Sequence, residues 1–441
     1  MSMLPPGSRL PALVQSVHAG RDPLGSVHGL RRAYGPIFTR RLITEPPQVV
    51  VGDLEAARQV FADPHGATLV GCPRRRLFEP MVGEHSLFTM DGPEWQRHHR
   101  MLAPALRGRS IDGWRDTIAE IADREIAGWP VGRPFPVHAA MRRIALEVIL
   151  RLVWGSRPTG HHDRPAGRHD RLRALAPRLL ERVPLAALVM PPPVRDRLLT
   201  ATGFIRMRRE LDTLLYAEIR DRRADPGPGT GDVLSMLLTA DGQALSDREV
   251  RDEMVTLLQA GHETTAVGLA WAFERLLRTP RAWDRLRDDP SDEVFLQAVA
   301  RETVRVRPVA LTGARRVVAP MEIQGYDVPA GWSVLPMIRL IHQDPAVFED
   351  PAAFRPERFL GEEAGAAMRA WLPFGHGARY CIGARLAMLT MRTVISRVAA
   401  TTDLAAPDPR PERPRLRQVT VSPASGTTAV ACPRRRVSAP G

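Results

Sequence analysis

The chain has 441 residues, of which 44% are hydrophobic and 25% are charged, proportions typical of a globular protein with a sizeable core rather than of a disordered chain. Its formal net charge of +13 first suggests nucleic-acid binding. However, none of the 62 basic residues is a lysine, and the arginines are spread along the chain instead of being gathered in one element that could enter a groove. We therefore expect no nucleic-acid partner, but a solvated basic surface that could receive an acidic protein.

The chain contains three cysteines, Cys72, Cys381 and Cys432. This sparse, odd number predicts no disulfide framework and is typical of the reducing cytoplasm. Residues 1–21 lack a long apolar run, and no later segment reaches the roughly 18 apolar residues of a membrane span. We expect neither a signal peptide nor a membrane anchor. An isolated cysteine is most often a buried, inert thiol, and we expect this of Cys72 and Cys432.

The first half of the chain is expected to be mainly helical. Residues 49–51 form a β-rich run after two prolines, so the first 70 residues should mix short strands with helices. Residues 114–224 show helical spacing of Leu, Ile and Ala, which three prolines at 191–193 interrupt. Residues 224–231 are rich in Pro and Gly and are predicted to form a loop.

A long helix is predicted to begin after Ser246. Glu249 follows Ser246 by three residues, which is the signature of a capping box. Apolar residues continue to Leu276, and Thr279 with Pro280 ends the helix. Such a helix has roughly 30 residues and is about 45 Å long, so it must cross the molecule.

The second half combines further helices with short strands. Residues 292–307 should form a helix that Pro308 ends, and residues 383–400 another. Residues 317–334 alternate between turn signals and should form short strands, and residues 418–437 should form a hairpin that turns at 423–426. The sequence predicts a mostly helical α+β fold with small sheets, in a single domain of residues 1–441.

Residues 374–383, Phe-Gly-His-Gly-Ala-Arg-Tyr-Cys-Ile-Gly, carry most of the chemical signal. Gly375 and Gly377 allow a tight turn that a side chain would obstruct. Cys381 lies at the start of a predicted helix, where backbone N–H groups and the helix dipole favour a thiolate. Arg379 is placed to neutralise a carboxylate of a cofactor.

This segment resembles the haem-binding signature of the cytochrome P450 family and matches its fixed positions, Phe374, Gly377, Arg379, Cys381 and Gly383. The resemblance implies that Cys381 is the axial thiolate ligand of haem b (iron protoporphyrin IX), and that Phe374, Gly375 and Arg379 lie beside the cofactor. The resemblance implies a haem-thiolate monooxygenase. The absence of lysine is typical of GC-rich coding, as in actinobacteria, so a bacterial member of the family is expected.

The long helix contains Ala-Gly-His-Glu-Thr-Thr at residues 260–265. Gly261 lowers helix stability, so either something approaches it closely or the helix deforms there. The hydroxyl of Thr264 can bond to the preceding turn. The resemblance implies that Ala260 and Gly261 lie over the haem and that Glu263 and Thr264 relay protons through water to dioxygen. Without the resemblance, a solvated Glu and a packed Thr would be the simpler interpretation.

Glu302 and Arg305 share one helical face at a spacing of three residues. Such a pair carries no functional information by itself. The resemblance implies that Glu302 and Arg305 form a cluster with Arg358, from the segment Phe-Arg-Pro-Glu-Arg-Phe at residues 354–359. The expected role of this cluster is structural support of the cysteine loop.

Trp95 and His99 lie four residues apart and share a helical face. The resemblance assigns this face to the haem propionates, with Arg100 as the alternative to His99. Arg315 matches the other propionate partner, and its neighbour Arg316 is the alternative. The Pro-Glu-Arg-Phe segment and Trp95 resemble the longer, microsomal-like branch of the family.

The resemblance implies that one atom of O₂ is inserted into a lipophilic small molecule, by hydroxylation or epoxidation, in secondary metabolism. Electrons would come from NAD(P)H through a ferredoxin reductase and a ferredoxin, which Arg97, Arg100 and Arg385 could receive, and the enzyme would be a monomer. The expected pocket positions are residues 69–88, the region near Pro191, Ala260, residues 309–312 and residues 422–426. Two alternatives remain: an oxygen-independent or peroxide-using haem-thiolate enzyme (an isomerase or peroxygenase), and a non-catalytic haem-binding recruitment module.

Overall fold

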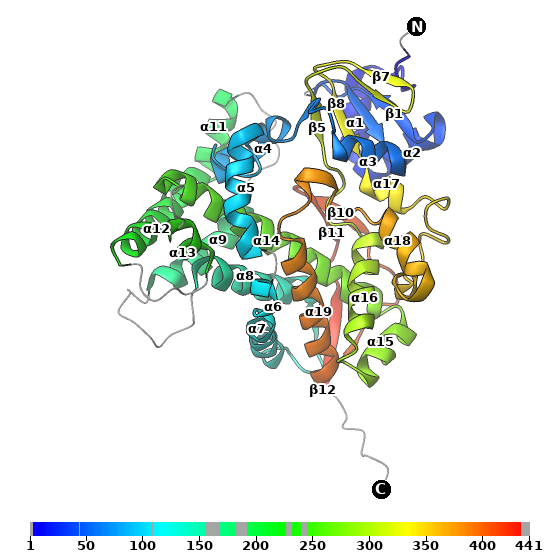
Figure 1. The fold of residues 1–441 in the computed structure, drawn as a ribbon. Helices are drawn as coiled ribbons and strands as arrows, with labels where there is room; N and C mark the ends of the chain where they lie inside the picture. Colours follow the sequence, from blue (N-terminus) through cyan, green and yellow to red (C-terminus); the bar gives the residue numbers. More distant parts are fainter. Residues whose placement is uncertain are drawn as a thin grey trace.

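The computed structural model describes residues 3–43, 45–106, 109–155, 167–181, 192–225, 232–239 and 245–433. Helices dominate it, and a small sheet near the N-terminus lies at one corner (Figure 1). This arrangement confirms the predicted mostly helical α+β fold. No helix in the described ranges has the length and apolarity needed to cross a bilayer.

The helices differ widely in length. Those of the first half are α1 (Ala12–Arg21), α2 (Pro23–Tyr34), α3 (Leu54–Ala62), α4 (Gly71–Val82), α5 (Gly92–Leu106), α6 (Arg109–Asp112), α7 (Arg115–Ala127), α8 (Val137–Trp154), α9 (Gly167–Glu181), α11 (Pro192–Ala201) and α12 (Phe204–Ala224). Those of the second half are α13 (Val233–Thr239), α14 (Asp247–Leu276), α15 (Pro280–Asp288), α16 (Glu293–Val306), α17 (Ile338–His342), α18 (Ala364–Ala370) and α19 (Ala384–Thr401). Short 3₁₀ turns are η1 (Pro356–Phe359), η2 (Gly361–Glu363) and η3 (Gly377–Arg379).

The strands form four small sheets. The largest has the order β1 (Ile37–Arg40), β2 (Gln48–Val51), β8 (Ser333–Pro336), β5 (Arg315–Val317) and β3 (Thr68–Leu69). In it, β2 and β8 pair in parallel and the other neighbours pair antiparallel. The smaller sheets are β4 (Pro134–Pro136) with β12 (Thr428–Pro433) and β9 (Thr402–Ala405), β10 (Pro414–Arg417) with β11 (Thr420–Pro423), and β6 (Met321–Ile323) with β7 (Tyr326–Val328).

The long helix α14 passes through the middle of the molecule, as its length predicts (Figure 1). Its capping box forms: the Ser246 hydroxyl accepts the Glu249 N–H, and the Glu249 carboxylate accepts the Ser246 N–H. Most of its residues are buried, because α8 packs against it on one side and α19 and α16 pack against it elsewhere. A rigid, buried helix of this kind can hold side chains in fixed positions inside the core.

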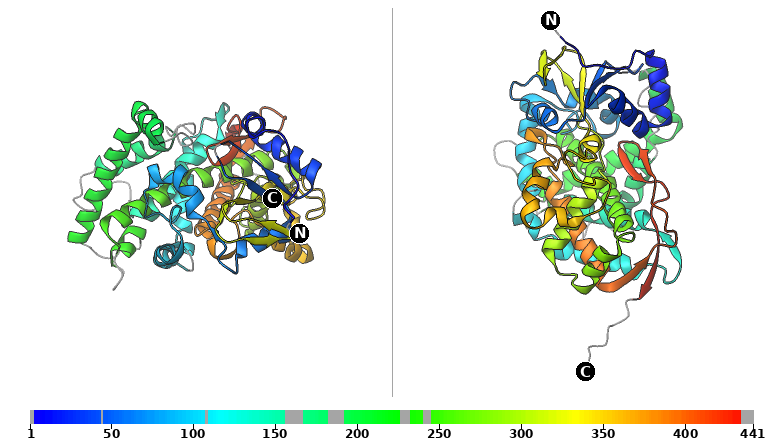
Figure 2. Two further views of the ribbon diagram at one scale, coloured as in Figure 1. Left: turned by 90° about the horizontal axis from the view of Figure 1, so that it is seen from above. Right: turned by 90° about the vertical axis from the view of Figure 1, so that its right-hand side faces the viewer.

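The molecule has a helical end and a sheet-bearing end. Helices α9, α11 and α12 lie at the end opposite the N-terminal sheet, as the view from above shows (Figure 2). The three-stranded sheet of β4, β12 and β9 joins segments that are far apart in the sequence, and β12 is the last stretch of the described chain (Figure 2). Between the two ends lie α14 and the loop before α19, which carry the candidate site.

Most predicted elements are present, but the terminal hairpin is not. The turn at 423–426 forms, and the Gly426 N–H donates to the carbonyl of Pro423 at 3.3 Å. However, β11 pairs with β10, whereas β12 pairs with β9 and β4. The prediction of a hairpin between β11 and β12 was therefore wrong, because β11 pairs with the preceding strand β10 and β12 pairs with two strands more distant in the sequence.

Two predicted breaks lie partly outside the described residues. Of the prolines at 191–193, Pro192 begins α11, a position that suits proline because the first helical residues need no N–H partner. Of the loop predicted at 224–231, Ala224 ends α12 and Asp225 caps it. Residues 226–231 and residue 191 fall outside the described ranges.

Candidate functional site

The loop before α19 brings Cys381 to the start of that helix. The Cys381 N–H donates to the carbonyl of Phe374 at 3.0 Å, and the Cys381 carbonyl accepts the N–H of Ala384 at 3.3 Å. Gly375 and Gly377 have φ angles of 76° and 69°, which side chains rarely adopt. The predicted need for two glycines in this turn is therefore confirmed.

Gly377 also permits a close approach between the cysteine loop and α3. A Cβ atom at this position would lie 2.4 Å from the backbone oxygen of Phe61. That oxygen cannot move away without displacing the end of α3. The cysteine loop is thus positioned by the N-terminal part of the chain as well as by α19.

The aromatic ring of Phe374 fills the space between the loop and the core. It lies 5.5 Å from the ring of Trp371 and 6.3 Å from that of Tyr380, measured between centroids. The Trp371 indole N–H donates to the carbonyl of Arg301 at 3.0 Å. Phe374 is therefore a packing residue of the loop.

None of the cysteines is in a disulfide, and the structure places all three at exposed positions in the described chain. The expectation that Cys72 and Cys432 are buried was wrong. Cys72 lies in the first turn of α4, and Cys432 points outward from β12 while its neighbour Ala431 is buried. Alternate residues of a strand face opposite sides, so a strand of this sheet has one exposed face.

The predicted cluster of Glu302, Arg305 and Arg358 is present behind the cysteine loop. The Arg305 guanidinium donates two hydrogen bonds to the Glu302 carboxylate at 2.6 and 2.8 Å, and Nε of Arg358 lies 3.4 Å from the same carboxylate. All three side chains are buried. Glu302 also accepts the N–H of Arg355, the residue just before η1, so the cluster holds the start of η1 in place.

His342 connects this cluster to the cysteine loop, and sequence reasoning missed it. Its Nδ1 lies 3.1 Å from the carbonyl of Arg305, and its Nε2 accepts the N–H of Leu372 at 3.0 Å. Complete burial, together with the nearby positive charge of Arg305, lowers the pKa of His342 to about 3. The imidazole is therefore neutral, with Nδ1–H as donor and Nε2 as acceptor. No sequence pattern marked this histidine, because its partners are backbone groups.

A second group of residues gathers around Arg379. Its guanidinium donates to the carbonyl of Met90 at 2.9 Å and to the Asp91 carboxylate at 2.8 Å. It also lies over the ring of Trp95 at 4.0 Å, a favourable cation–π distance. Trp95 in turn stacks on His99 with centroids 4.7 Å apart. The sequence-predicted residues Arg379, Trp95 and His99 are thus brought together, whereas Arg100 is exposed.

Arg315 joins this group and Arg316 does not. Arg315 is buried. Burial is the main cause that lowers its pKa to about 10, and the positive charge of Arg74 lowers it further. Burial lowers the pKa of Arg379 to about 10 as well, and Arg74 and Arg315 add to the effect. Arg316 instead donates to the carbonyl of Gly331 at 3.0 Å. The structure thus favours Arg315 over its neighbour as a site residue.

Arg74, Arg315 and Arg379 form what we call the arginine cluster, and sequence reasoning missed the first of them. Burial lowers the pKa of Arg74, while the charges of Asp91 and Cys381 raise it. Within the described chain, Nε of Arg315 is buried without a hydrogen-bond partner. The charge of Asp91 acts on all three guanidinium groups, and Arg315 has Asp63 as a second acidic neighbour. Three cations beside two carboxylates leave positive charge in excess, so this cluster can accept a further anionic group.

Asp91 has a second role that the sequence did not reveal. Its carboxylate accepts the backbone N–H groups of Val70, Gly71 and Cys72, each at 2.9 Å. These groups lie at the start of α4, where helical N–H donors have no partner in the helix itself. Asp91 therefore links the first turn of α4 to Arg379 in the cysteine loop.

The middle of α14 carries the predicted distal residues. The Thr264 hydroxyl donates to the carbonyl of Ala260, as predicted from the residue type. The Glu263 carboxylate turns toward α8, where it lies 3.2 Å from Nε2 of His138 and 3.0 Å from Nε of Arg142. Burial would raise the pKa of Glu263, but His138 and Arg142 together lower it. Glu263 is therefore held as a carboxylate.

The close approach predicted at Gly261 comes from α8. A Cβ atom at Gly261 would lie 2.6 Å from Cδ1 of Ile149. The glycine therefore allows α8 and α14 to pack closely. The alternative expectation, a deformed helix, is not needed to explain this glycine, because α14 is α-helical throughout its length.

Comparisons with known proteins agree with the geometry. A family model described as Cytochrome P450 matches residues 4–427. The chain is 38% identical to cytochrome P450 135B1 of Mycobacterium tuberculosis over 451 residues, covering 99% of this chain and 93% of that protein. It is 36% identical to cytochrome P450 138 of the same organism, covering 97% of this chain and 96% of the other.

Solved structures show the same fold. The retinoic acid-bound cyanobacterial CYP120A1 superimposes with a TM-score of 0.83 at 23% identity, covering 98% of this chain and all of that one. The haem domain of cytochrome P450DA gives a TM-score of 0.83 at 23% identity, with 99% of each chain covered.

Proposed function

From the premise that the chain belongs to the cytochrome P450 family and is a haem-thiolate monooxygenase, we propose that Cys381 supplies the axial thiolate. We also propose that the arginine cluster binds the haem propionates. The cofactor, when bound, supplies the chemistry of oxygen activation. The protein's own residues hold the cofactor, orient the substrate and move protons.

One observation carries this assignment: the orphaned, buried Nε of Arg315 lies in a cluster of guanidinium groups that also includes the signature residue Arg379. A propionate carboxylate would satisfy these donors and relieve their mutual repulsion. Arg74 is close enough to Cys381 for their charges to interact, so the cluster and the thiol belong to one site. The residues present therefore fit a haem, with Phe374, Gly375, Ala260 and Gly261 proposed beside it.

Glu263 and Thr264 are proposed as the proton relay. The carboxylate of Glu263 is kept ionised by His138 and Arg142, so it can accept a proton from water and pass it on. The Thr264 hydroxyl donates its proton to the carbonyl of Ala260, which leaves its oxygen lone pairs available to accept a hydrogen bond from water. Trp95 and His99 are proposed to support the propionate side.

The substrate is proposed to be a lipophilic small molecule that is hydroxylated or epoxidised in secondary metabolism. The expected pocket segment 309–312 lies beside β11, the strand that leads into the expected segment 422–426, because the Val421 N–H donates to the carbonyl of Val309 at 2.9 Å and Ala310 pairs with Thr420. Both segments border α14, where Gly268 lies against a methyl group of Val309. An apolar surface beside the relay would bind a substrate mainly by excluding water.

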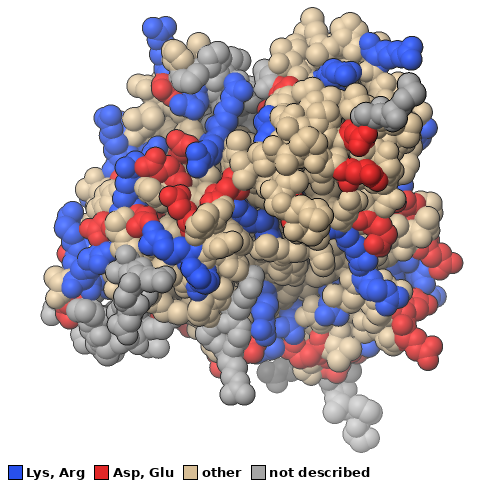
Figure 3. Space-filling view, turned by 45° about the horizontal axis from the view of Figure 1, so that its top comes forward, with Lys and Arg blue, Asp and Glu red and all other residues tan. Residues whose placement is uncertain are grey.

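Electrons are proposed to come from NAD(P)H through a ferredoxin reductase and a ferredoxin. The enzyme is proposed to be a single-domain monomer in the cytoplasm, where the thiol of Cys381 stays reduced. Arg100 and Arg385 are exposed and could receive an acidic donor. Arg97 pairs with Glu249 and is a weaker candidate than expected. On the face drawn in Figure 3, basic and acidic side chains are intermixed, so the docking surface would be local rather than a large basic field.

Turnover with ferredoxin, its reductase, NADPH and isotopically labelled O₂ tests this function. One labelled oxygen atom should appear in the product, and NADPH should be consumed only when all components are present. Conversion of a substrate without O₂, or turnover with peroxide alone, would instead identify the isomerase or peroxygenase.

A further inference from the structure

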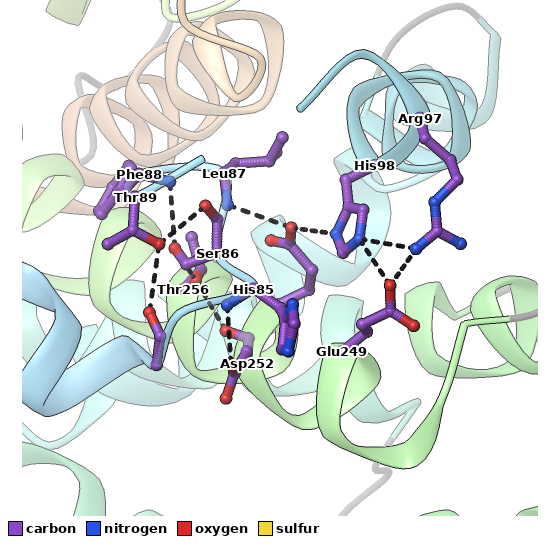
Figure 4. A network of polar contacts seen from close by, with 12 residues as sticks. His85, Ser86, Leu87, Phe88, Thr89, Arg97, His98, Glu249, Asp252 and Thr256 are labelled. Carbon is purple, nitrogen blue, oxygen red and sulfur yellow. Dashed lines mark hydrogen bonds and ion pairs between the residues drawn. The ribbon is translucent and has the colours of Figure 1, made fainter. Parts of the chain in front are cut away.

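The segment between α4 and α5, residues 83–89, is held against α14 by three consecutive backbone or hydroxyl contacts. The His85 N–H donates to Asp252 at 3.0 Å, and the Leu87 N–H donates to Glu253 at 3.1 Å. The hydroxyls of Thr256 and Ser86 lie 2.6 Å apart (Figure 4). All three partners on α14 are buried, so each contact is protected from water.

The opposite side of this segment faces the cysteine loop. Arg379 donates to the carbonyl of Met90 at 2.9 Å and lies 3.5 Å from that of Leu87. The N–H of Leu87 thus donates to Glu253 on α14, and its carbonyl accepts from Arg379, the proposed propionate-binding arginine. Residues 83–88 also belong to the segment 69–88 that is expected to border the substrate pocket, so their position affects both the pocket and the cofactor side.

His98 on α5 supports the carboxylate that holds Leu87. Its imidazole is 1% exposed. Nδ1 lies 2.8 Å from Oε1 of Glu253, the oxygen that accepts the Leu87 N–H. Nε2 lies 3.3 Å from Oε1 of Glu249 (Figure 4). Within the described chain, Oε2 of Glu253 is buried without a partner. The charge of Glu253 is therefore compensated at one oxygen only, by His98 and Leu87.

The surrounding charges favour protonated His98. Burial by itself would lower its pKa, but the hydrogen bonds and charges of Glu253 and Glu249 outweigh burial and raise it. Glu249 stays ionised: burial opposes this, but the Ser246 capping box, His98 and Arg97 lower its pKa to about 2. Burial raises the pKa of Glu253.

The other charged neighbours do not replace His98. Asp252 pairs with Arg251 at 2.8 Å. Arg97 pairs with Glu249, and its guanidinium nitrogen lies 3.5 Å from Nε2 of His98 rather than beside Glu253. Helix α13, which also packs on α5, contributes Val-Leu-Ser-Met-Leu-Leu-Thr and no charge. His98 is thus the cation that faces Glu253 directly.

We propose that His98 is a positioning residue of the monooxygenase: in its protonated form it holds Glu253, and through Glu253 it keeps the 83–89 segment closed over the substrate side of α14. A protonated imidazole donates from both nitrogens, one to each carboxylate. A neutral imidazole has one donor only, so deprotonation leaves a buried carboxylate without its counter-charge. The segment then opens, because only contact with water can then solvate the negative charge of Glu253.

The segment has room to move outward. Gly83, Glu84 and Asp252 line one wall of a surface cleft of about 430 Å³ between α4, α12 and α14. Gly83 has a φ of 94°, and a Cβ there would lie 2.2 Å from the Asp252 carboxylate, so the closed position requires glycine at the start of the segment. Protonated His98 stabilises the closed segment at low pH, and this stabilisation is lost as the pH rises through the raised pKa of His98. The segment is therefore expected to open at a pH above that pKa.

Amide hydrogen exchange tests the proposal directly. The full-length, haem-loaded protein is exchanged between pH 6 and pH 9, with rates corrected for the intrinsic pH dependence of exchange. Protection of the His85 and Leu87 amides should fall about tenfold across the titration of His98. In His98→Gln, which keeps a hydrogen-bond donor but cannot take up a proton, protection should be lower at pH 6 and should not change with pH.

His85→Gln serves as the matched control, because it removes a second titratable imidazole from the same region and leaves the His98 pair intact. Its exchange profile should follow that of the wild type. The association rate of a phenyl-substituted imidazole with the haem provides a second readout, and it should rise with pH in the wild type and be independent of pH in His98→Gln.

The proposal is overturned if the Leu87 amide shows the same pH dependence in the wild type and in His98→Gln. One part of this proposal, that the 83–89 segment closes over a substrate pocket, rests on the proposed function. The exchange experiment needs no substrate, so its failure is distinguishable from a failure of the monooxygenase assignment, which the absence of labelled product would show.

Discussion

The carboxylate of Glu263 lies 3.2 Å from Nε2 of His138, so the middle of α14 is connected to the first turn of α8. Arg142, one turn further along α8, reaches the same carboxylate. His138 is buried and its backbone N–H donates to the carbonyl of Gly426, in the turn after β11. The proposed proton relay is therefore continuous with a turn that borders the proposed pocket.

Replacing Glu263 with Gln should uncouple the enzyme. The amide keeps the size of the side chain but cannot carry a proton, so product formed per NADPH should fall on the order of tenfold or more, with peroxide formed instead. The loss of an ion pair that is about a quarter exposed should cost no more than about 1 kcal/mol of stability. Glu293→Gln, which alters a half-buried, ion-paired carboxylate at the start of α16, is the control. Unchanged coupling in Glu263→Gln would remove Glu263 from the relay.

His342 should make the protein sensitive to acid. Its pKa is about 3 in the folded chain against an ordinary 6.5, so the unfolded chain takes up a proton first as the pH falls. The stabilising contribution is present above about pH 6.5 and is lost toward pH 3. His342→Asn should lower the free energy of unfolding by about 1–3 kcal/mol at pH 7, because the loop loses a hydrogen bond.

The pH dependence distinguishes this role from simple packing. Urea unfolding between pH 4.5 and pH 7 should show a shallower loss of stability in His342→Asn than in the wild type. Parallel curves for the two proteins would mean that the histidine does not titrate with unfolding.

Gly377→Ala should displace the cysteine loop. The new Cβ would meet the backbone oxygen of Phe61 at 2.4 Å, and the φ of 69° is unfavourable for alanine. We expect a destabilisation of about 1–3 kcal/mol and weaker haem retention, both measurable by thermal unfolding followed at the Soret band. Gly365→Ala in α18 provides the comparison, since its Cβ would have ordinary van der Waals contact only. Equal melting temperatures for both variants would contradict the close approach.

Arg315 and Arg316 offer a matched pair for the propionate assignment. Arg315→Ala removes a buried guanidinium from the arginine cluster, whereas Arg316→Ala removes one that bonds to the carbonyl of Gly331. Transfer of haem to apomyoglobin should be about tenfold faster from Arg315→Ala than from the wild type. Arg316→Ala should release haem at the wild-type rate. The opposite ranking would reassign the site to Arg316.

The sequence predicted the elements whose signals are local. Ser246 and Glu249 define the start of α14 because a capping box needs only residues within one turn. The glycines at 375 and 377 were predictable for the same reason, since backbone geometry is a local property. The terminal hairpin failed as a prediction because β11 already pairs with the strand before it, β10, and because the pairing of β12 with β4 and β9 depends on the whole fold.

The residues that were missed act through distant or backbone partners. Arg74 belongs to a basic run that looks like a solvated surface, yet the fold places it beside Asp91 and Cys381. In the described part of the chain, the hydrogen bonds of His342 go to backbone groups. His98 meets two carboxylates more than 150 positions away in the sequence. Such groups leave no spacing pattern, so only the tertiary arrangement identifies them.

The most direct test of the central assignment is the carbon monoxide difference spectrum of the reduced, haem-loaded protein. The wild type should show the Soret band at the wavelength from which the family takes its name, because a thiolate ligand produces it. Cys381→Ser should lose this band while still folding, and Cys72→Ser and Cys432→Ser, which alter exposed cysteines elsewhere, should keep it. A thiolate-type band that persists in Cys381→Ser, or is absent from the well-folded wild type, would contradict Cys381 as the ligand.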